Sequence, residues 1–195
     1  MEPDDGINAG VLLASFLKDH LIGDGQVFTE FIAGSFLGDT RGRALNLEFT
    51  DDASGDTTFN AGVMRFEKGK GGKVEVSMRY SISCPFDEKL EQVQVEGFSL
   101  NVNSNSKPHY VDADDPFIRT LQDAYEKQTG EKAELLAIGG GTYARVMKKG
   151  VAFGMLFPGE KDVAHQLDEF VDIKNLVKAT AIYAEAISRL ACDDK

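Results

Sequence analysis

Few side chains in this chain could act as a nucleophile or hold a transition metal. Its three histidines are His20, His109 and His165, and only the last follows an apolar run that is typical of a buried strand. Loops that leave buried strands are frequent ligand sites. Asp168 and Glu169 stand close to it in sequence, and a neutral imidazole beside carboxylates suits zinc. One histidine does not make a metal site, so a surface role for His165 is the competing interpretation.

Three consecutive glycines end at Gly141 and are followed by Thr142. Successive glycines let backbone N–H groups approach a ligand closely. The run lacks the GK[ST] ending of a P-loop, and no acid stands where a dinucleotide-binding GxGxxG motif needs one. A ligand-contacting turn and a purely structural turn therefore remain equal interpretations.

Arg79 lies on the polar face of a segment that alternates polar and apolar residues. Its guanidinium could bind a carboxylate bidentately, or it could be a solvated charge or part of a surface ion pair. The chain has no arguable Ser-His-Asp order, and neither Cys84 nor Cys192 has a histidine nearby in sequence. These two cysteines form no CxxC pair, which excludes a zinc knuckle and argues against a disulfide framework.

The elements that position Arg79 are predicted by a period of two. Residues 73–82 alternate regularly, which predicts a half-buried strand. Together with residues 59–66 and the glycine-rich turn between them, they predict an antiparallel hairpin. Apolar stripes and Pro85 predict three helices in this part, and a short strand is expected before a polar bend. The helices are expected near residues 7–16, 27–36 and 85–93, and the strand at residues 45–49.

The rest of the chain alternates predicted helices and strands. Asp115 followed by Pro116 is a good helix start, and Gly130 is a typical stop. Strands are expected at residues 133–138 and 151–157, the second buried on both faces, and a final helix at 172–190. We predict two domains, residues 1–112 with an antiparallel sheet (α+β) and residues 113–195 as a partial α/β domain. Its few strands would leave an apolar edge uncovered.

Composition restricts the class of protein. The chain has 195 residues, 42% of them hydrophobic, enough for a real core, and a net charge of -11. A groove-binding protein needs a basic footprint, so this balance argues against nucleic acid and anionic membranes as partners. No apolar run is long enough to span a bilayer. The N-terminus has no basic region typical of a secretory signal, so a cytoplasmic location is expected.

The chain resembles bacterial PepV-type dipeptidases of the zinc-dependent aminoacylase and carboxypeptidase G clan. The stretches that carry the resemblance are Ile138–Arg145, Val151–Gly154, Phe157–Gly159, His165–Glu169 and Ala179–Ile187. Met1–Ala9, Phe59–Gly62 and Met78–Tyr80 are similar to that family's lid domain, so the resemblance covers essentially the whole chain. The chain departs from the family at Ser81, where proline is usual, and at Asp168, where asparagine is commoner.

The resemblance implies a zinc-dependent hydrolysis of dipeptides by a metal-activated water, with two zinc ions in the full-length enzyme. It implies that His165 is a zinc ligand and that Arg79 of the lid binds the substrate carboxylate. It further implies that Gly141 and Thr142 contact substrate through their backbone.

The same resemblance implies that this chain is the C-terminal part of an enzyme more than twice as long. Most of the metal ligands and the glutamate general base lie in the other part. We therefore expect weak zinc binding at most and no activity from this chain alone. The alternatives are a non-catalytic module that dimerises or binds a peptide, and a subunit completed in trans by the N-terminal remainder.

Overall fold

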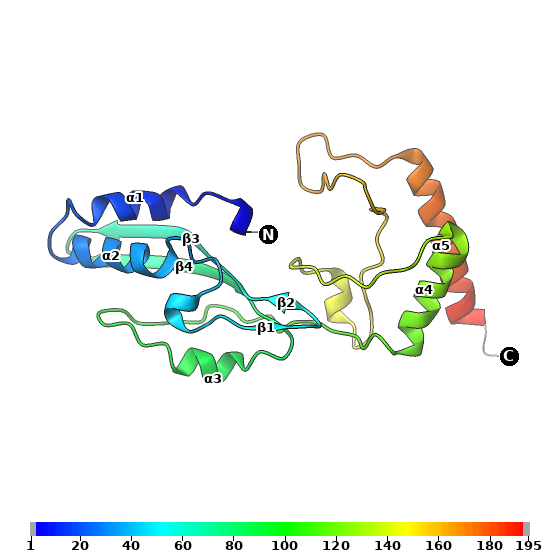
Figure 1. Cartoon of the computed structure of the whole chain (residues 1–195), viewed down its shortest axis with the longest axis horizontal. Helices are drawn as coiled ribbons and strands as arrows, with labels where there is room; N and C mark the ends of the chain where they lie inside the picture. Colours follow the sequence, from blue (N-terminus) through cyan, green and yellow to red (C-terminus); the bar gives the residue numbers. More distant parts are fainter. Residues whose placement is uncertain (1–2, 193–195) are drawn as a thin grey trace. The chain divides into compact units, whose positions relative to one another are not determined.

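The computed structural model describes residues 3–192, and the chain separates into two compact units (Figure 1). One unit contains the chain up to His109 together with Ala137–Gly140, and the other contains Tyr110–Leu136 and the chain from Gly141 onward. Within residues 3–192 no helix is both long and apolar enough to cross a membrane. The boundary at residue 112 and the assignment of a lid and a catalytic part remain predictions.

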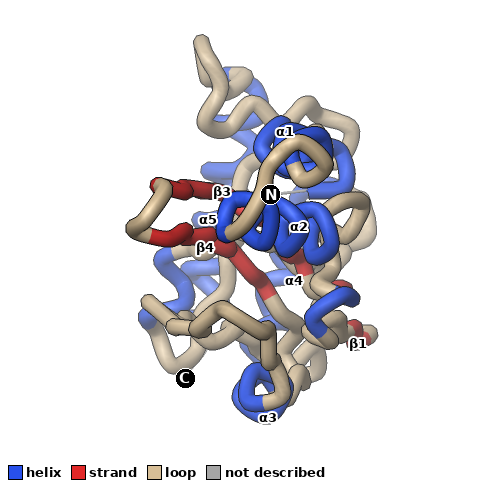
Figure 2. The backbone as a smooth tube through the Cα atoms, turned by 90° about the vertical axis from the view of Figure 1, so that its left-hand side faces the viewer, coloured by secondary structure: helices blue, strands red, loops and turns tan. Residues whose placement is uncertain are grey.

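The first unit is built on a two-stranded hairpin, as predicted. Strands β3 (Thr58–Glu67) and β4 (Gly71–Arg79) pair antiparallel, with a bulge between Ala61 and Val63. Helices α1 (Ala9–Leu17) and α2 (Asp24–Phe36) lie together on one side of this hairpin (Figure 2). Arg79 is the last residue of β4 and lies opposite Thr58.

The core of this unit fills the space between the helices and the hairpin. Aromatic rings dominate it, and the rings of Phe36 and Phe59 stack with centroids 5.2 Å apart. Asn8 fixes the start of α1, because its Oδ1 accepts from Val11 N–H at 3.2 Å while its Nδ2 donates to the Ala61 carbonyl at 2.9 Å. The buried members of the core are Val11, Ala14, Phe28, Ile32, Phe36, Leu47, Phe59 and Ala61.

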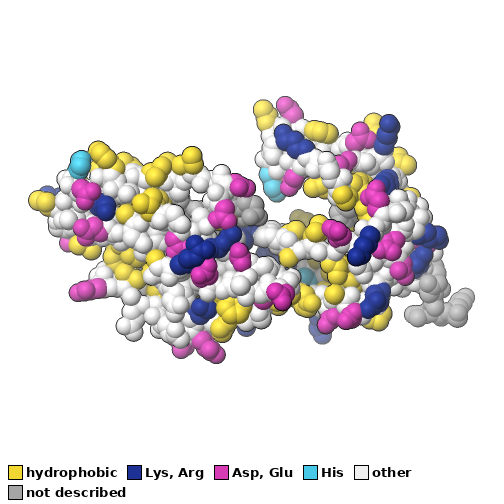
Figure 3. Space-filling view, in the orientation of Figure 1, with side chains coloured by type: hydrophobic (Ala, Val, Ile, Leu, Met, Phe, Trp, Pro, Cys, Tyr) yellow, Lys and Arg dark blue, Asp and Glu magenta, His cyan; other side chains and the backbone are white. Residues whose placement is uncertain are grey.

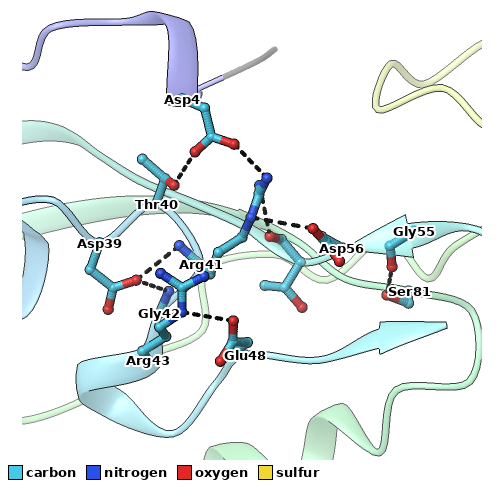
Figure 4. A network of polar contacts seen from close by, with 11 residues as sticks. Asp4, Asp39, Thr40, Arg41, Gly42, Arg43, Glu48, Gly55, Asp56 and Ser81 are labelled. Carbon is cyan, nitrogen blue, oxygen red and sulfur yellow. Dashed lines mark hydrogen bonds and ion pairs between the residues drawn. The ribbon is translucent and has the colours of Figure 1, made fainter.

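A polar network holds the segment between α2 and the hairpin (Figure 4). Arg41 pairs with Asp4 of the 3-10 turn η1 (Pro3–Asp5), donates to the Thr57 carbonyl at 3.2 Å and lies 3.6 Å from Asp56. The Asp39 carboxylate accepts from the backbone N–H groups of the next turn. The network thus ties two separate stretches of chain, η1 and residues 56–57, to one arginine.

The strand expected at residues 45–49 is wrong. The chain there forms the 3-10 turn η2 (Arg43–Leu45), bracketed by left-handed residues at Gly42 and Asn46. Its N–H groups bond to Asp39 and to the turn itself, so they are not available for a ladder. The small ladder of β1 (Thr50–Asp51) and β2 (Gly55–Asp56) follows, and α3 (Phe86–Glu91) comes after β4.

The second unit is built on two helices, and the first has its ends where the sequence predicts them, whereas the second runs two residues beyond the predicted end at residue 190. Helix α4 (Pro116–Thr129) begins at Asp115, whose side chain accepts from Phe117 N–H, and ends at a left-handed Gly130. Helix α5 (Ile173–Cys192) packs against α4, and Lys127 pairs with Glu185 at 2.7 Å across the two helices. The 3-10 turn η3 (Tyr143–Val146) lies in the connection between them.

The strands predicted in this unit are wrong. Within residues 3–192, neither 133–138 nor 151–157 pairs with another segment. All ladder hydrogen bonds of a strand come from a neighbouring strand, and the described chain supplies none. Instead, alternate residues of 151–157 pack on the helices, and Tyr183 Oη of α5 donates to the Phe153 carbonyl at 2.7 Å. The segment is therefore covered on one face, where burial on both was expected.

Candidate functional site

Arg79 has an unusual environment in the first unit. The side chain is half-buried, and its Nε is buried with no hydrogen-bond partner in the described chain. A Cβ built at Gly139 would lie 3.5 Å from both Cδ and Nη1 of Arg79, so the glycine run passes directly beside the guanidinium. No carboxylate among residues 3–192 forms an ion pair with Arg79. A buried donor without an acceptor is rare in folded proteins, and each one calls for an explanation.

The chain immediately after Arg79 is held in place by three contacts. The Tyr80 ring stacks on Phe86 of α3 at 4.4 Å between centroids, and its Oη donates to Asn105 Oδ1 at 2.7 Å. The Ser81 hydroxyl, which is buried, donates to the Gly55 carbonyl. A guanidinium on such a fixed backbone is preorganised to bind a planar anion bidentately.

The glycine turn continues into the second unit at Gly141 and Thr142. A Cβ at Gly141 would lie 2.7 Å from Arg145 Nη1, so the missing side chain is what lets that guanidinium lie over the turn. Thr142 caps η3 in an extended conformation without a side-chain hydrogen bond, and its carbonyl accepts from Arg145 N–H at 3.3 Å. Gly141 can offer a ligand only its backbone groups, whereas Thr142 offers its backbone and a hydroxyl that makes no capping bond.

His165 lies in an exposed loop of the second unit. Its φ of 62° and the φ of 57° at Asp168 are left-handed, a conformation that costs non-glycine residues free energy. The backbone N–H of His165 donates to Glu169 Oε2 at 3.0 Å, so this carboxylate engages the histidine's backbone. Asp162 caps the start of the loop by accepting from Ala164 N–H at 2.9 Å.

The described residues do not form a metal centre. Across residues 3–192 no three His, Cys, Asp or Glu side chains come together in a way that could hold an ion. A zinc site needs three or four such ligands. His165 alone therefore does not fit a complete zinc site, although its exposed imidazole could contribute one ligand to a site with others.

Cys84 is not activated as a nucleophile. Cys84 is a free, half-buried thiol, and burial raises its pKa, which disfavours the reactive thiolate. The side chain of Cys192 lies outside the described residues.

Of the predicted site residues, Gly141, Thr142 and His165 share the second unit, and no described hydrogen bond joins Thr142 to His165. Gly139, the neighbour of Arg79, was missed, although it stands in the glycine run that the sequence singled out.

Comparison with known proteins supplies the family. The family model described as peptidase family M20/M25/M40 matches residues 6–189. A "Putative dipeptidase YtjP" of Bacillus subtilis is 46% identical over 195 residues, covering 98% of this chain and 42% of the relative. A "Putative dipeptidase" of Staphylococcus epidermidis is 40% identical over 199 residues, with 100% of this chain and 42% of the relative covered. The chain thus spans 42% of the length of these curated relatives.

Proposed function

Since the chain belongs to peptidase family M20/M25/M40, we propose that it supplies the lid and the last part of the catalytic domain of a PepV-type dipeptidase. The similarity to dipeptidases over nearly the whole chain supports this role. Members of the family are generally metal-dependent, typically with zinc. The substrate is a dipeptide, and the location is the cytoplasm.

One observation carries this proposal, which is the unpartnered Nε of Arg79. A dipeptide presents one terminal carboxylate, and an arginine binds it with two parallel N–H···O bonds. In this proposal, Arg79 is the residue that binds this carboxylate. Gly139 leaves the guanidinium accessible at its Nη1 side, because no side chain occupies that space.

The second unit contributes the remaining proposed roles. The backbone of Gly141 and Thr142 contacts the substrate, because a glycine lets a ligand approach the main chain closely. His165 donates one imidazole ligand to the metal of the complete enzyme, for which its exposed position leaves it available. Because the described residues assemble no further ligands around it, we expect this chain to bind zinc weakly at most.

The role of Arg79 is tested by binding to the 195-residue chain. We expect Ala-Ala to shift the NMR resonances of Gly139 and of residues around Arg79, and Ala-Ala amide to bind at least about tenfold more weakly. Arg79→Gln should lose this preference, and Arg79→Lys should keep part of it because lysine is a point charge without a fork. Arg43→Gln, an exposed arginine of the same unit, is the matched control. Equal binding of the acid and the amide would overturn the assignment.

Activity is a separate matter from binding. We expect no hydrolysis of a dipeptide panel by this chain in the presence of zinc or manganese. A catalytic zinc site needs three protein ligands, and the described residues contain no group of three His, Cys, Asp or Glu side chains that could hold a metal ion. Metal-dependent hydrolysis by the purified chain would contradict this. Restored hydrolysis on adding the N-terminal part of a relative would indicate completion in trans.

The outer face of α1 favours a second candidate, a module that forms a homodimer. Leu12, Leu13 and Phe16 are each more than half exposed, and hydrophobic side chains gather along this helix in Figure 3. Contiguous apolar patches commonly mark interaction sites. Light scattering across a concentration series tests it, and Leu13→Glu should dissociate the dimer. A monomer at every concentration would exclude this candidate.

A further inference from the structure

The chain that follows Arg79 is bonded to the turn between β1 and β2. The Ser81 hydroxyl donates to the Gly55 carbonyl (Figure 4), and the Ile82 N–H donates to the Ser54 hydroxyl at 2.8 Å. Strand β4 ends at Arg79, so no ladder bond of that strand holds the residues beyond it. The bonds to the turn therefore take over where the ladder stops.

Asp51 of the same turn holds the next residue along. Its Oδ2 accepts from the Ser83 N–H at 3.0 Å and from the Ser83 hydroxyl at 2.7 Å. We name residues 51–55 the clamp turn. Three consecutive residues, 81–83, are thus each bonded to it. A hydrogen-bond network whose members are satisfied stiffens the segments that it joins.

The clamp turn is also linked to Arg79 through the other strand of the hairpin. Two residues separate its end from Thr58, which lies opposite Arg79 in the ladder. One of these two, Thr57, is fully buried, and its N–H donates to the Phe49 carbonyl at 2.8 Å. Arg79 is therefore flanked by two attachments to one turn, one through the covalent chain and one through hydrogen bonds.

The side chain of Arg79 needs such a support. An arginine has many rotamers and normally extends its polar atoms into water. The Nε of Arg79 is instead buried with no partner in the described chain, although a swing of the guanidinium toward water would satisfy it. A backbone that is fixed on both sides keeps the direction of the Cα–Cβ bond constant, and this limits the swing.

Ser81 is the contact of the clamp turn that lies nearest to Arg79 in the chain. It is only 2% exposed, so water does not easily replace its bond to Gly55. We propose that Ser81 is a positioning residue, which holds the Arg79 guanidinium where its fork meets a peptide carboxylate. This role rests on the proposed function of Arg79. It assigns part of the selectivity for a carboxylate to a hydroxyl that does not touch the substrate.

Exchange of the Arg79 Nε–H with water, followed by NMR, tests the positioning without a ligand. On the full 195-residue chain, Ser81→Ala should speed this exchange at least about tenfold, because a mobile guanidinium exposes the N–H more often. The matched control is Ser77→Ala, at an exposed serine two residues before Arg79 whose hydroxyl forms no hydrogen bond among the described residues. Its exchange should stay within about twofold of that of the unaltered chain.

A second variant keeps the test decisive if Ser81→Ala does not fold. Ser54→Ala removes the acceptor of the Ile82 N–H at a half-buried position, and it should also speed the exchange of the Arg79 Nε–H. Unchanged exchange in the variants of the clamp turn would overturn the positioning role.

Peptide binding tests the consequence for selectivity. The preference of about tenfold for Ala-Ala over Ala-Ala amide should fall to about threefold or less in Ser81→Ala and persist in Ser77→Ala. Gly72→Ala, which places a Cβ 2.5 Å from the Phe28 ring, should destabilise the same unit and keep the preference. Loss of stability alone then does not account for the effect. In an Arg79→Gln background, Ser81→Ala should change binding no further.

Two results of the binding experiment separate the role of Ser81 from that of Arg79. A preference that is present in the unaltered chain and undiminished in Ser81→Ala would overturn the role of Ser81 alone. Equal binding of the acid and the amide by the unaltered chain would overturn the proposed function of Arg79, and with it the selectivity assigned to Ser81, whatever the exchange rates.

Discussion

Asp51 gathers four hydrogen bonds on one carboxylate. Ser54 and Ser83 each donate to it from both the backbone N–H and the hydroxyl, at distances between 2.6 and 3.0 Å. The Ser83 N–H is the largest of the causes that hold the pKa of Asp51 well below its usual range, followed by the Ser83 hydroxyl and, opposed by partial burial, Ser54. The carboxylate thereby ties the β1–β2 turn to the chain that follows Arg79.

This pKa shift predicts how stability depends on pH. A lowered pKa in the folded state means that the contribution of Asp51 is complete above its ordinary value of 3.8 and is lost as the pH falls through the folded value. Asp51→Asn should therefore be less stable than the unaltered chain in urea at about pH 6, and the difference should shrink at about pH 3. Asp52→Asn, at the exposed neighbour, should show no difference at either pH. A difference that is independent of pH would contradict the role of the charge.

Residue-scale prediction succeeded where the information was local. The alternation around Arg79 predicted a strand, and Arg79 is the last residue of β4, although it is half-buried and does not lie on an exposed polar face. Asp115, Pro116 and Gly130 marked the ends of α4. The neighbours that make Arg79 unusual come from other parts of the chain. Gly139 approaches it only because of the tertiary fold, and no period or motif in one sequence encodes such an approach.

At the scale of elements, Gly72 of β4 is where the backbone of the β3–β4 hairpin packs against Phe28 of α2. Replacing it by alanine puts a methyl group 2.5 Å from the buried Phe28 ring, and an overpacked core costs about 1–3 kcal/mol. We expect Gly72→Ala to lower the free energy of unfolding by this amount in urea. Gly34 of α2 has no atom within 4 Å of its Cβ position, so Gly34→Ala should instead stabilise by about 0.5–1 kcal/mol. Equal effects of the two would contradict the packing argument.

The elements also show why the strands of the second unit were mispredicted. The hairpin is a local structure, because its two strands and its turn are contiguous and satisfy each other's hydrogen bonds. The apolar run at 151–157 has the composition of a strand, yet a strand exists only with a partner. Its apolar residues alternate in burial because they pack on α4 and α5. The apolar composition correctly predicted that one face of residues 151–157 is buried. The segment is not a strand because no other described segment pairs with it.

For the whole molecule, the two units differ in how much core they have. Among the described residues, eight buried ones form one cluster in the first unit, whereas the second unit has two clusters of three. The chain between α4 and α5 contains η3 and otherwise no helix or strand in the described residues. Local stability follows buried apolar contacts and protected backbone hydrogen bonds.

Hydrogen exchange should reveal this difference. We expect amides of α2, β3 and β4 to exchange at least about a hundredfold more slowly than amides of residues 147–172, because the latter have few hydrogen-bonded N–H groups. The amides of α4 and α5 should exchange at intermediate rates. Uniform protection across residues 110–192 would contradict this account of the second unit.

The role proposed for Arg79 predicts that ligand binding is linked to the thermodynamics of folding through its unpartnered nitrogen. A buried donor without an acceptor makes the folded state less stable by about 1–3 kcal/mol. A carboxylate that accepts from it stabilises the folded state and not the unfolded chain, so the melting temperature rises with the logarithm of the free carboxylate concentration. Heat resistance would then report occupancy of Arg79 even in a chain that performs no chemistry.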